Sequence, residues 1–205
     1  MDEKYKFGLL GIVLGSVLSA IFAVIKELYA ERRAKRKEAE YLAIRMVCIF
    51  ESFMEVCASV VGDDGTYHGQ TDADGYSRIQ VTAPQLDVNL SDVNWKSLPP
   101  ELMYEILYFP NLIKDADSFI DSTFEYAADP PDYSDVFEER KYQYSQLGIM
   151  ASELTAKLRK KYKIPKKHIS SWDVVEYMTS ERDKIKQLRL KREAEHNAMF
   201  AEKNA

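Results

Sequence analysis

A run of 19 residues without a charged side chain, Phe7 to Ile25, most constrains how this chain can fold. At a helical rise of about 1.5 Å per residue the run extends about 28 Å, close to the hydrocarbon thickness of a bilayer. A helix is favoured there because it satisfies every backbone polar group internally. The run therefore predicts a single transmembrane helix over 7–25, preceded by a short tail over 1–6.

A cleaved secretory signal peptide is the alternative interpretation of this run. Signal peptides have a shorter apolar stretch and a small-residue cleavage site before a polar mature sequence. Here Lys26 and Glu27 follow the run directly, and neither Pro nor Gly interrupts the chain from there to Val61. The sequence therefore favours an uncleaved anchor that continues into a long helix over 26–61.

Basic residues flank the run unevenly. Two lysines precede it and six basic residues follow it within twelve positions. The first of the six is Lys26, and we call the others the basic collar: Arg32, Arg33, Lys35, Arg36 and Lys37. An excess of Lys and Arg marks the cytoplasmic flank. We therefore expect a single-pass inner-membrane protein with its C-terminal part in the cytoplasm, the collar fixing topology and contacting lipid headgroups.

Small residues recur at every fourth position through the apolar run: Gly11, Gly15, Ser19 and Ala23. Such a stripe lets two helix backbones approach closely in lipid. It therefore predicts self-association or docking to another membrane helix. The alternative is the general abundance of small residues in membrane helices, which requires no partner helix.

Charge is strongly segregated in the rest of the chain. Residues 62–138 hold 3 basic and 16 acidic side chains, whereas residues 139–205 hold 16 basic and 9 acidic. We expect these segments to pack together, with ion pairs that orient helices more than they stabilise them. The densest basic run lies at 157–167: Lys157, Arg159, Lys160, Lys161, Lys163, Lys166 and Lys167. Its other possible targets are lipid headgroups, an acidic partner or nucleic acid, of which nucleic acid is the weakest expectation.

Apolar spacing predicts a mainly α fold, with a helical bundle over 99–190. Helical periods run over 99–126 and 134–162, and a last helix begins near Ser170 or Ser171. Pro110 is expected to kink or split the first of these helices near Tyr108.

The two remaining segments are expected to be irregular. Residues 62–98 form an acidic insertion, in which 78–82 and 85–90 read either as short strands or as extended chain lying on the helices. The polar end, 191–205, is expected to be a frayed or disordered tail.

Four tyrosines lie around the Pro130-Pro131 turn: Tyr126, Tyr133, Tyr142 and Tyr144. Tyrosine is favoured at interfaces because it buries a large area and keeps a polar group. These residues, with Lys160, Lys161, Lys163, Lys166 and Lys167, are therefore a possible partner surface. Packing of the turn onto the bundle is the alternative.

Motifs of known chemistry are missing from the sequence. The acidic stretch around Gly75 resembles a calcium loop in spacing, but Val81 stands where a bidentate carboxylate is needed. We expect no cofactor and no metal. The sequence favours a membrane-anchored interaction or scaffold protein, self-associating or a subunit of a membrane complex. The alternatives are a membrane-attached enzyme, a defence or stress effector with an unrecognised site, or a lipid- or nucleic-acid-binding module.

Overall fold

Four α-helices and a single 3-10 turn make up the regular structure in the computed structural model, which describes residues 3–88, 90–166 and 172–203. Of these, 3–14 and 201–203 are described by their backbone alone. The elements are α1 (Glu3–Val61), η1 (Trp95–Ser97), α2 (Pro100–Ala127), α3 (Ser134–Tyr162) and α4 (Val174–Lys203). Within the described residues there is no β-strand, so the mainly α fold and the helical bundle are confirmed.

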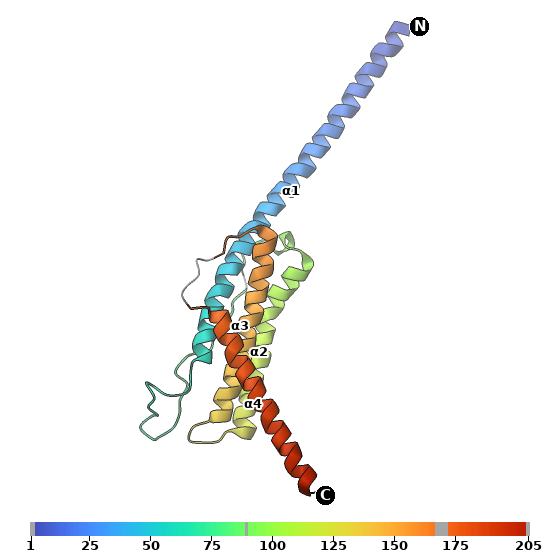
Figure 1. Ribbon diagram of the computed structural model, residues 1–205. Helices are drawn as coiled ribbons and strands as arrows, with labels where there is room; N and C mark the ends of the chain where they lie inside the picture. Colours follow the sequence, from blue (N-terminus) through green and yellow to red (C-terminus); the bar gives the residue numbers. More distant parts are fainter. Residues whose placement is uncertain (1–2, 89, 167–171, 204–205) are drawn as a thin grey trace.

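Helix α1 is a single unbroken helix of 59 residues, and it has two parts (Figure 1). Residues 15–38 are exposed throughout and project from one end of the bundle. Residues 39–61 pack against the other helices and supply much of the core. We call these stretches the free part and the packed part of α1.

The core lies between the packed part of α1, α2 and α3. Buried residues of α1 recur three or four positions apart, which places them on one face of the helix. The ring of Phe109 on α2 meets Phe50 and Phe53 of α1 edge-on, with centroids 5.1 and 5.5 Å apart. Such aromatic pairs contribute beyond the area that they bury. The apolar stripe of α3 completes the core: Leu147, Ala151, Leu154 and Leu158.

Of the kink or split expected at Pro110, the split is wrong, because α2 runs through Pro110 as one helix. A proline inside a helix removes one backbone hydrogen bond and costs about 3 kcal/mol. Buried side chains on both sides of Pro110, Phe109 and Ile113, hold the helix against the core. Tertiary packing therefore offsets the cost of the proline.

The two ends of α4 also differ from expectation. The side chain of Asp173 accepts hydrogen bonds from the backbone N–H groups of Val175 and Glu176, at 2.9 and 3.2 Å, and so caps the helix. Ser170 and Ser171, predicted as caps, lie outside the described residues. The expected irregular tail is instead helical as far as Lys203. An ion pair one turn apart, Lys191 with Glu195, supports the helix there.

Apart from η1, the described residues of 62–98 form neither a helix nor a strand. The stretches 78–82 and 85–88 are therefore not strands, and Leu86 and Val88 are buried in the core. The first turn of this insertion is fixed by Asp63. That carboxylate accepts hydrogen bonds from the backbone N–H groups of Gly65, Gln80 and Val81, each at 3.0 Å. Two distant stretches of the insertion are therefore tied to the end of α1.

Candidate membrane-facing and interaction surfaces

The outer stretch of the free part of α1, residues 15–25, carries no charged side chain on any side. Its large apolar side chains are half exposed or more and, at 100° per residue, lie within about 160° of one another: Val17, Leu18, Ile21, Phe22, Val24 and Ile25. Small residues occupy the rest of the circumference: Gly15, Ser16, Ser19, Ala20 and Ala23. A helix without charge on any side is typical of a membrane span or of a large protein core. No other helix of the described chain lies near this segment (Figure 1).

The small-residue stripe lies on this free part. Around Gly15 nothing in the described structure comes within 4 Å of where a Cβ atom would be. Ser19 and Ala23 are also exposed, whereas Gly11 belongs to the stretch described by its backbone alone. The stripe is thus available to another helix, and the association that it predicts stays a prediction.

A membrane span is not supported by the described residues. Among the side chains that the structure describes, no helix is long and apolar enough to cross a bilayer. Residues 7–14 of the predicted span lie outside those side chains, and the described remainder, 15–25, is too short to cross alone. The span over 7–25 therefore stays a prediction.

Two basic groups that are far apart in the sequence lie at the same end of the bundle. The C-terminal end of α3 lies beside the point where α1 leaves the bundle (Figure 1). Burial and the nearby carboxylate of Glu40 raise the pKa of Tyr162, the last residue of α3. At the same end, the amide of Asn94, just before η1, donates to the carboxylate of Glu38 at 2.8 Å.

We call this set of cationic side chains the basic end. It comprises the basic collar together with Lys96, Lys160, Lys161, Lys163 and Lys166. Lys96 and the four lysines of α3 and its C-terminal flank are exposed. Lys167, predicted as part of the same run, lies outside the described residues. The basic run therefore lies next to the collar, although some 120 residues separate them in sequence.

Ion pairs join the acidic segment 62–138 to the basic segment 139–205, as expected. Glu105 pairs with Lys157 at 2.7 Å, and Glu138 pairs with both Arg189 and Arg192 at 3.0 Å. Asp63 and Arg140 form the buried pair of this set, at 2.8 Å, with side chains 0% and 4% exposed. Loss of one partner from a buried pair is costly, whereas exposed pairs contribute little.

The four tyrosines around Pro130 and Pro131 do not form one surface. Tyr144 belongs to the core, 1% exposed, and its hydroxyl donates to Asp117 at 2.6 Å. Burial raises the pKa of this hydroxyl, with the contact to Asp117 acting in the same direction. The prediction that Tyr144 lies on a partner surface is wrong, because its helical position faces the core together with Leu147 and Ala151.

Tyr133 and Tyr142 fit the alternative, in which the turn packs onto the bundle. The ring of Tyr133 stacks on Phe124 with centroids 5.8 Å apart. The guanidinium of Arg189 lies 4.5 Å from the centroid of the Tyr142 ring, which joins α4 to α3. Tyr126, 81% exposed, is the remaining tyrosine and lies on the outer side of α2.

An aromatic face on α2 was not predicted. Tyr104, Tyr108, Phe119 and Tyr126 fall within about 60° of one another at 100° per helical residue, and they are 64%, 39%, 60% and 81% exposed. The first two rings stack with centroids 5.4 Å apart. We call these four residues the α2 aromatic face. The sequence carries a signal for this face, an aromatic pair one helical turn apart, which is distinct from the core stripe.

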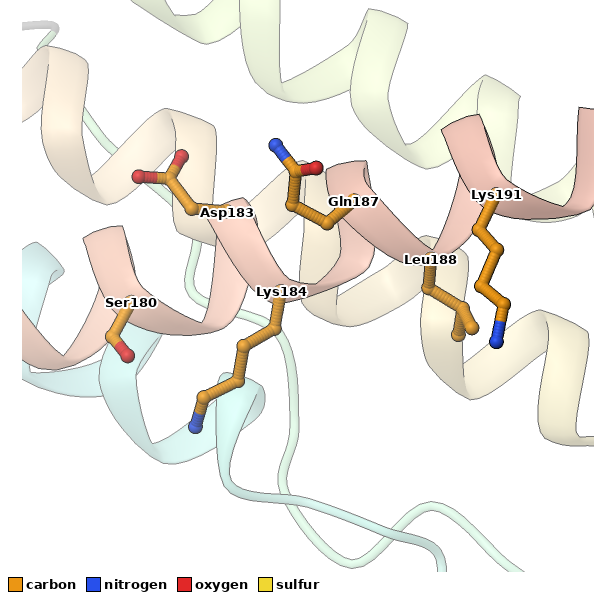
Figure 2. A pocket seen from close by; sticks show the side chains of 6 residues that line it. All are labelled: Ser180, Asp183, Lys184, Gln187, Leu188 and Lys191. Atoms are coloured by element: carbon orange, nitrogen blue, oxygen red, sulfur yellow. The ribbon is translucent and has the colours of Figure 1, made fainter. Parts of the chain in front are cut away.

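A shallow groove of about 700 Å³ lies along α4 (Figure 2). Its lining residues all belong to that one helix: Ser180, Asp183, Lys184, Gln187, Leu188 and Lys191. Lys184 is already paired with Glu181 at 2.6 Å. With one helix as its wall, the groove is open to solvent on its other sides.

The two cysteines and the calcium-like stretch differ in their surroundings. Burial raises the pKa of the Cys57 thiol, which keeps it protonated, while Cys48 is exposed. The carboxylate of Asp72, in the calcium-like stretch, receives the side chain of Arg78 at 2.7 Å and two backbone N–H groups. Within the described residues, no group of three or more His, Cys, Asp or Glu side chains is arranged to hold a metal ion.

Comparisons of the chain with family models, with curated proteins and with solved structures found no match.

Proposed function

We propose that this protein is a single-pass, membrane-anchored helical protein that acts by binding a partner at the membrane. The observation that carries the proposal is the free part of α1. Its outer stretch, 15–25, is exposed and uncharged, and the basic collar lies between that stretch and the bundle.

Lipid fits the free part of α1 better than a protein partner does. A soluble monomer rarely exposes a contiguous apolar patch of this kind. A protein partner would cover one face, and the other faces would then carry polar residues. Between Gly15 and Ile25 no side of the helix carries a charged residue: large apolar side chains cover about 160° of the circumference and small residues cover the rest. Acyl chains, which contact a helix on every side, match a stretch that is uncharged all round.

Topology follows from the collar. Its five basic residues lie between the apolar run and the bundle, and this supports placing the bundle on the cytoplasmic side. The anchor then spans the inner membrane over 7–25.

Partner binding is supported by two surfaces. The stripe of Gly15, Ser19 and Ala23 offers a close approach to a second membrane helix. The α2 aromatic face offers exposed rings of the kind that are enriched at protein interfaces. The protein then works as a scaffold, either self-associating or as a subunit of a membrane complex.

Extraction of native membranes tests the anchor. We expect the full chain to remain in the pellet after alkaline carbonate treatment, and its release into the supernatant would contradict the proposal.

Cys48 serves as a natural topology reporter because it is exposed, whereas Cys57 is buried. We expect a membrane-impermeant maleimide to label Cys48 only after the inner membrane is permeabilised. The Cys48→Ser variant gives the background level of labelling. Labelling of Cys48 in intact spheroplasts would show the opposite topology, with the bundle outside the inner membrane.

Association through the stripe is tested separately, in a membrane two-hybrid assay. We expect Gly11→Ile with Gly15→Ile to abolish association, because branched side chains keep helix backbones apart. The control, Val17→Ile with Val24→Ile, adds volume elsewhere on the helix. Association that survives the glycine substitutions would leave partner binding to the α2 aromatic face.

A further inference from the structure

We propose that the bundle leans onto the membrane through the basic end, and that the ligand of this surface is the anionic headgroup layer of the bilayer. The inference rests on the membrane anchor proposed above and adds a second contact to it. It involves the lysines of α3 and its C-terminal flank, which the sequence places far from the anchor.

The first step is the position of these lysines. Tyr162, at the end of α3, is near enough to Glu40 for the charge of that carboxylate to affect its hydroxyl. The side chain of Arg159, on the same helix, pairs with Glu51 of α1 at 2.5 Å. Helix α3 thus runs beside the packed part of α1 with its C-terminal end toward the free part (Figure 1). Lys160, Lys161, Lys163 and Lys166 are exposed and belong to this end of α3 or to the chain that follows it.

The second step is charge. Among the described residues, no ion pair involves any of these four lysines. Exposed carboxylates lie at the opposite end of the bundle, in the first turns of the insertion and in the turn between α2 and α3: Asp64, Asp74, Asp129 and Asp132. An anionic surface therefore attracts one end of the bundle and repels the other. Each basic residue near such a surface contributes about 1 kcal/mol.

The third step is distance. Fifteen helical residues separate Ile25 from Glu40, which corresponds to about 22 Å at 1.5 Å per residue. Headgroups occupy about 5–7 Å of that gap. Transmembrane helices tilt by about 20° on average, and α3 lies about 9 Å to one side of α1. If the anchor tilts toward α3, the C-terminal end of α3 moves about 4 Å closer to the bilayer. The long lysine side chains then bring their charges within about one Debye length, 8 Å, of the headgroups.

The fourth step is rigidity. Helix α1 is unbroken from the free part into the core, so a tilt of the anchor moves the bundle with it. The headgroup contact of the basic end thereby selects the direction of the tilt. Nucleic acid is a weaker partner for the same lysines, because the bilayer lies against the adjoining collar.

The experiment measures the distance from α3 to the bilayer in the full chain. The Cys48→Ser variant carries a donor dye at Ala156→Cys, an exposed position on α3, and Cys57 stays buried. The chain is reconstituted in nanodiscs with acceptor-labelled headgroups. One set contains phosphatidylcholine alone and the other includes phosphatidylglycerol. We expect higher energy transfer with phosphatidylglycerol, and we expect this increase to be lost near 1 M salt, where the Debye length is about 3 Å.

Two sets of substitutions make the test specific. Replacement of Lys160, Lys161 and Lys166 by Gln should remove the increase. Replacement of Lys184, Lys186 and Lys191 on α4 by Gln, which changes the net charge equally, should preserve it. A version with Arg at the first three positions should also keep it, which separates lost charge from lost folding.

The outcomes distinguish the two proposals. A chain that does not enter the disc overturns both the anchor and the leaning bundle. If the chain inserts but energy transfer is the same in the two lipid compositions, the leaning of the bundle is overturned and the anchor is not. The same holds if the α4 control substitutions reduce energy transfer as much as the α3 substitutions do. If the α3 substitutions abolish binding of single-stranded RNA but leave transfer unchanged, the lysines serve nucleic acid instead.

Discussion

The free and packed parts of α1 belong to one helix and are both rich in apolar residues, yet their surroundings are opposite. In the packed part, apolar residues follow a stripe, and that stripe is buried against the core. In the outer stretch of the free part, residues 15–25, no side of the helix is charged, and the large apolar side chains remain exposed. Hydrophobicity alone therefore does not place a segment inside a bundle. The angular distribution shows whether its partner is one face of the same chain or something that covers every side.

The largest expected difference between the two parts concerns a pair of phenylalanines. Phe50 is 0% exposed and Phe22 is 71% exposed, on the same helix. Phe50→Ala should lower the free energy of unfolding of the bundle by about 3–5 kcal/mol, through lost burial and a cavity. Phe22→Ala should change it by less than about 0.5 kcal/mol.

The measurement is chemical unfolding of the full chain in nanodiscs, followed by circular dichroism. Equal losses for both phenylalanine variants would mean that the free part also packs within the folded chain, and the contrast between the two parts would fail.

A pair of arginines gives the next largest effect. Arg140 is buried against Asp63, whereas Arg36 of the free part pairs with Glu40 in solvent at 2.9 Å. Arg140→Leu should cost about 3 kcal/mol, because it leaves a buried carboxylate with its backbone donors alone. Arg36→Leu should cost at most about 0.5 kcal/mol. If the same unfolding experiment gave Arg140→Leu a cost as small as that of Arg36→Leu, the buried pair would not anchor the insertion.

A pair of glycines sharpens the same contrast at a smaller scale. A Cβ atom on Gly148 would lie 2.3 Å from the sulfur of Met178, whereas one on Gly15 would meet nothing within 4 Å. Gly148→Ala should destabilise the bundle by about 1–3 kcal/mol through overpacking between α3 and α4. Gly15→Ala should leave bundle stability unchanged, and thermal midpoints of the two variants make the comparison. A neutral Gly148→Ala would show that the Met178 side chain moves aside freely.

Much of the fold could be predicted from local pattern. The ends of α3 and the core stripe of the packed part follow from helical spacing and from turn residues, which act within a few positions. The continuity of α2 through Pro110 could not be predicted, because it depends on core contacts of Phe109 and Ile113. The helical end of α4 does not follow from its polar composition, which is compatible both with disorder and with an exposed helix held by ion pairs one turn apart.

The surfaces were harder to predict than the elements. The collar and the lysines near the end of α3 were each visible in the sequence, but their meeting depends on α3 running antiparallel to the packed part of α1. The position of Tyr144 depends on which face of α3 is buried. The α2 aromatic face repeats at a helical spacing and was within reach of the sequence.

Acid should weaken the packed part through Asp63, which follows it directly. Burial alone would raise the pKa of this carboxyl, but the backbone N–H groups of Val81, Gly65 and Gln80, together with Arg140, outweigh burial and lower the pKa below its ordinary value. A lowered folded pKa means that the stabilisation is complete above the unfolded value of about 3.9. It is lost as pH falls through the folded pKa, where Asp63 takes up a proton.

The expected result is a decline in unfolding free energy below about pH 4 that is shallower in Asp63→Asn than in the unsubstituted chain. Asp63→Asn should also be less stable at neutral pH, since it no longer places a negative charge beside Arg140. Asp72→Asn is the matched control: hydrogen bonds from Arg78 and from backbone N–H groups also lower the pKa of Asp72, but its pairing with Arg78 is exposed to solvent. Its effect should be smaller, because water and salt screen an exposed pair. If Asp72→Asn made the decline of unfolding free energy below about pH 4 as shallow as Asp63→Asn does, the stabilising effect of Asp63 would not depend on its burial.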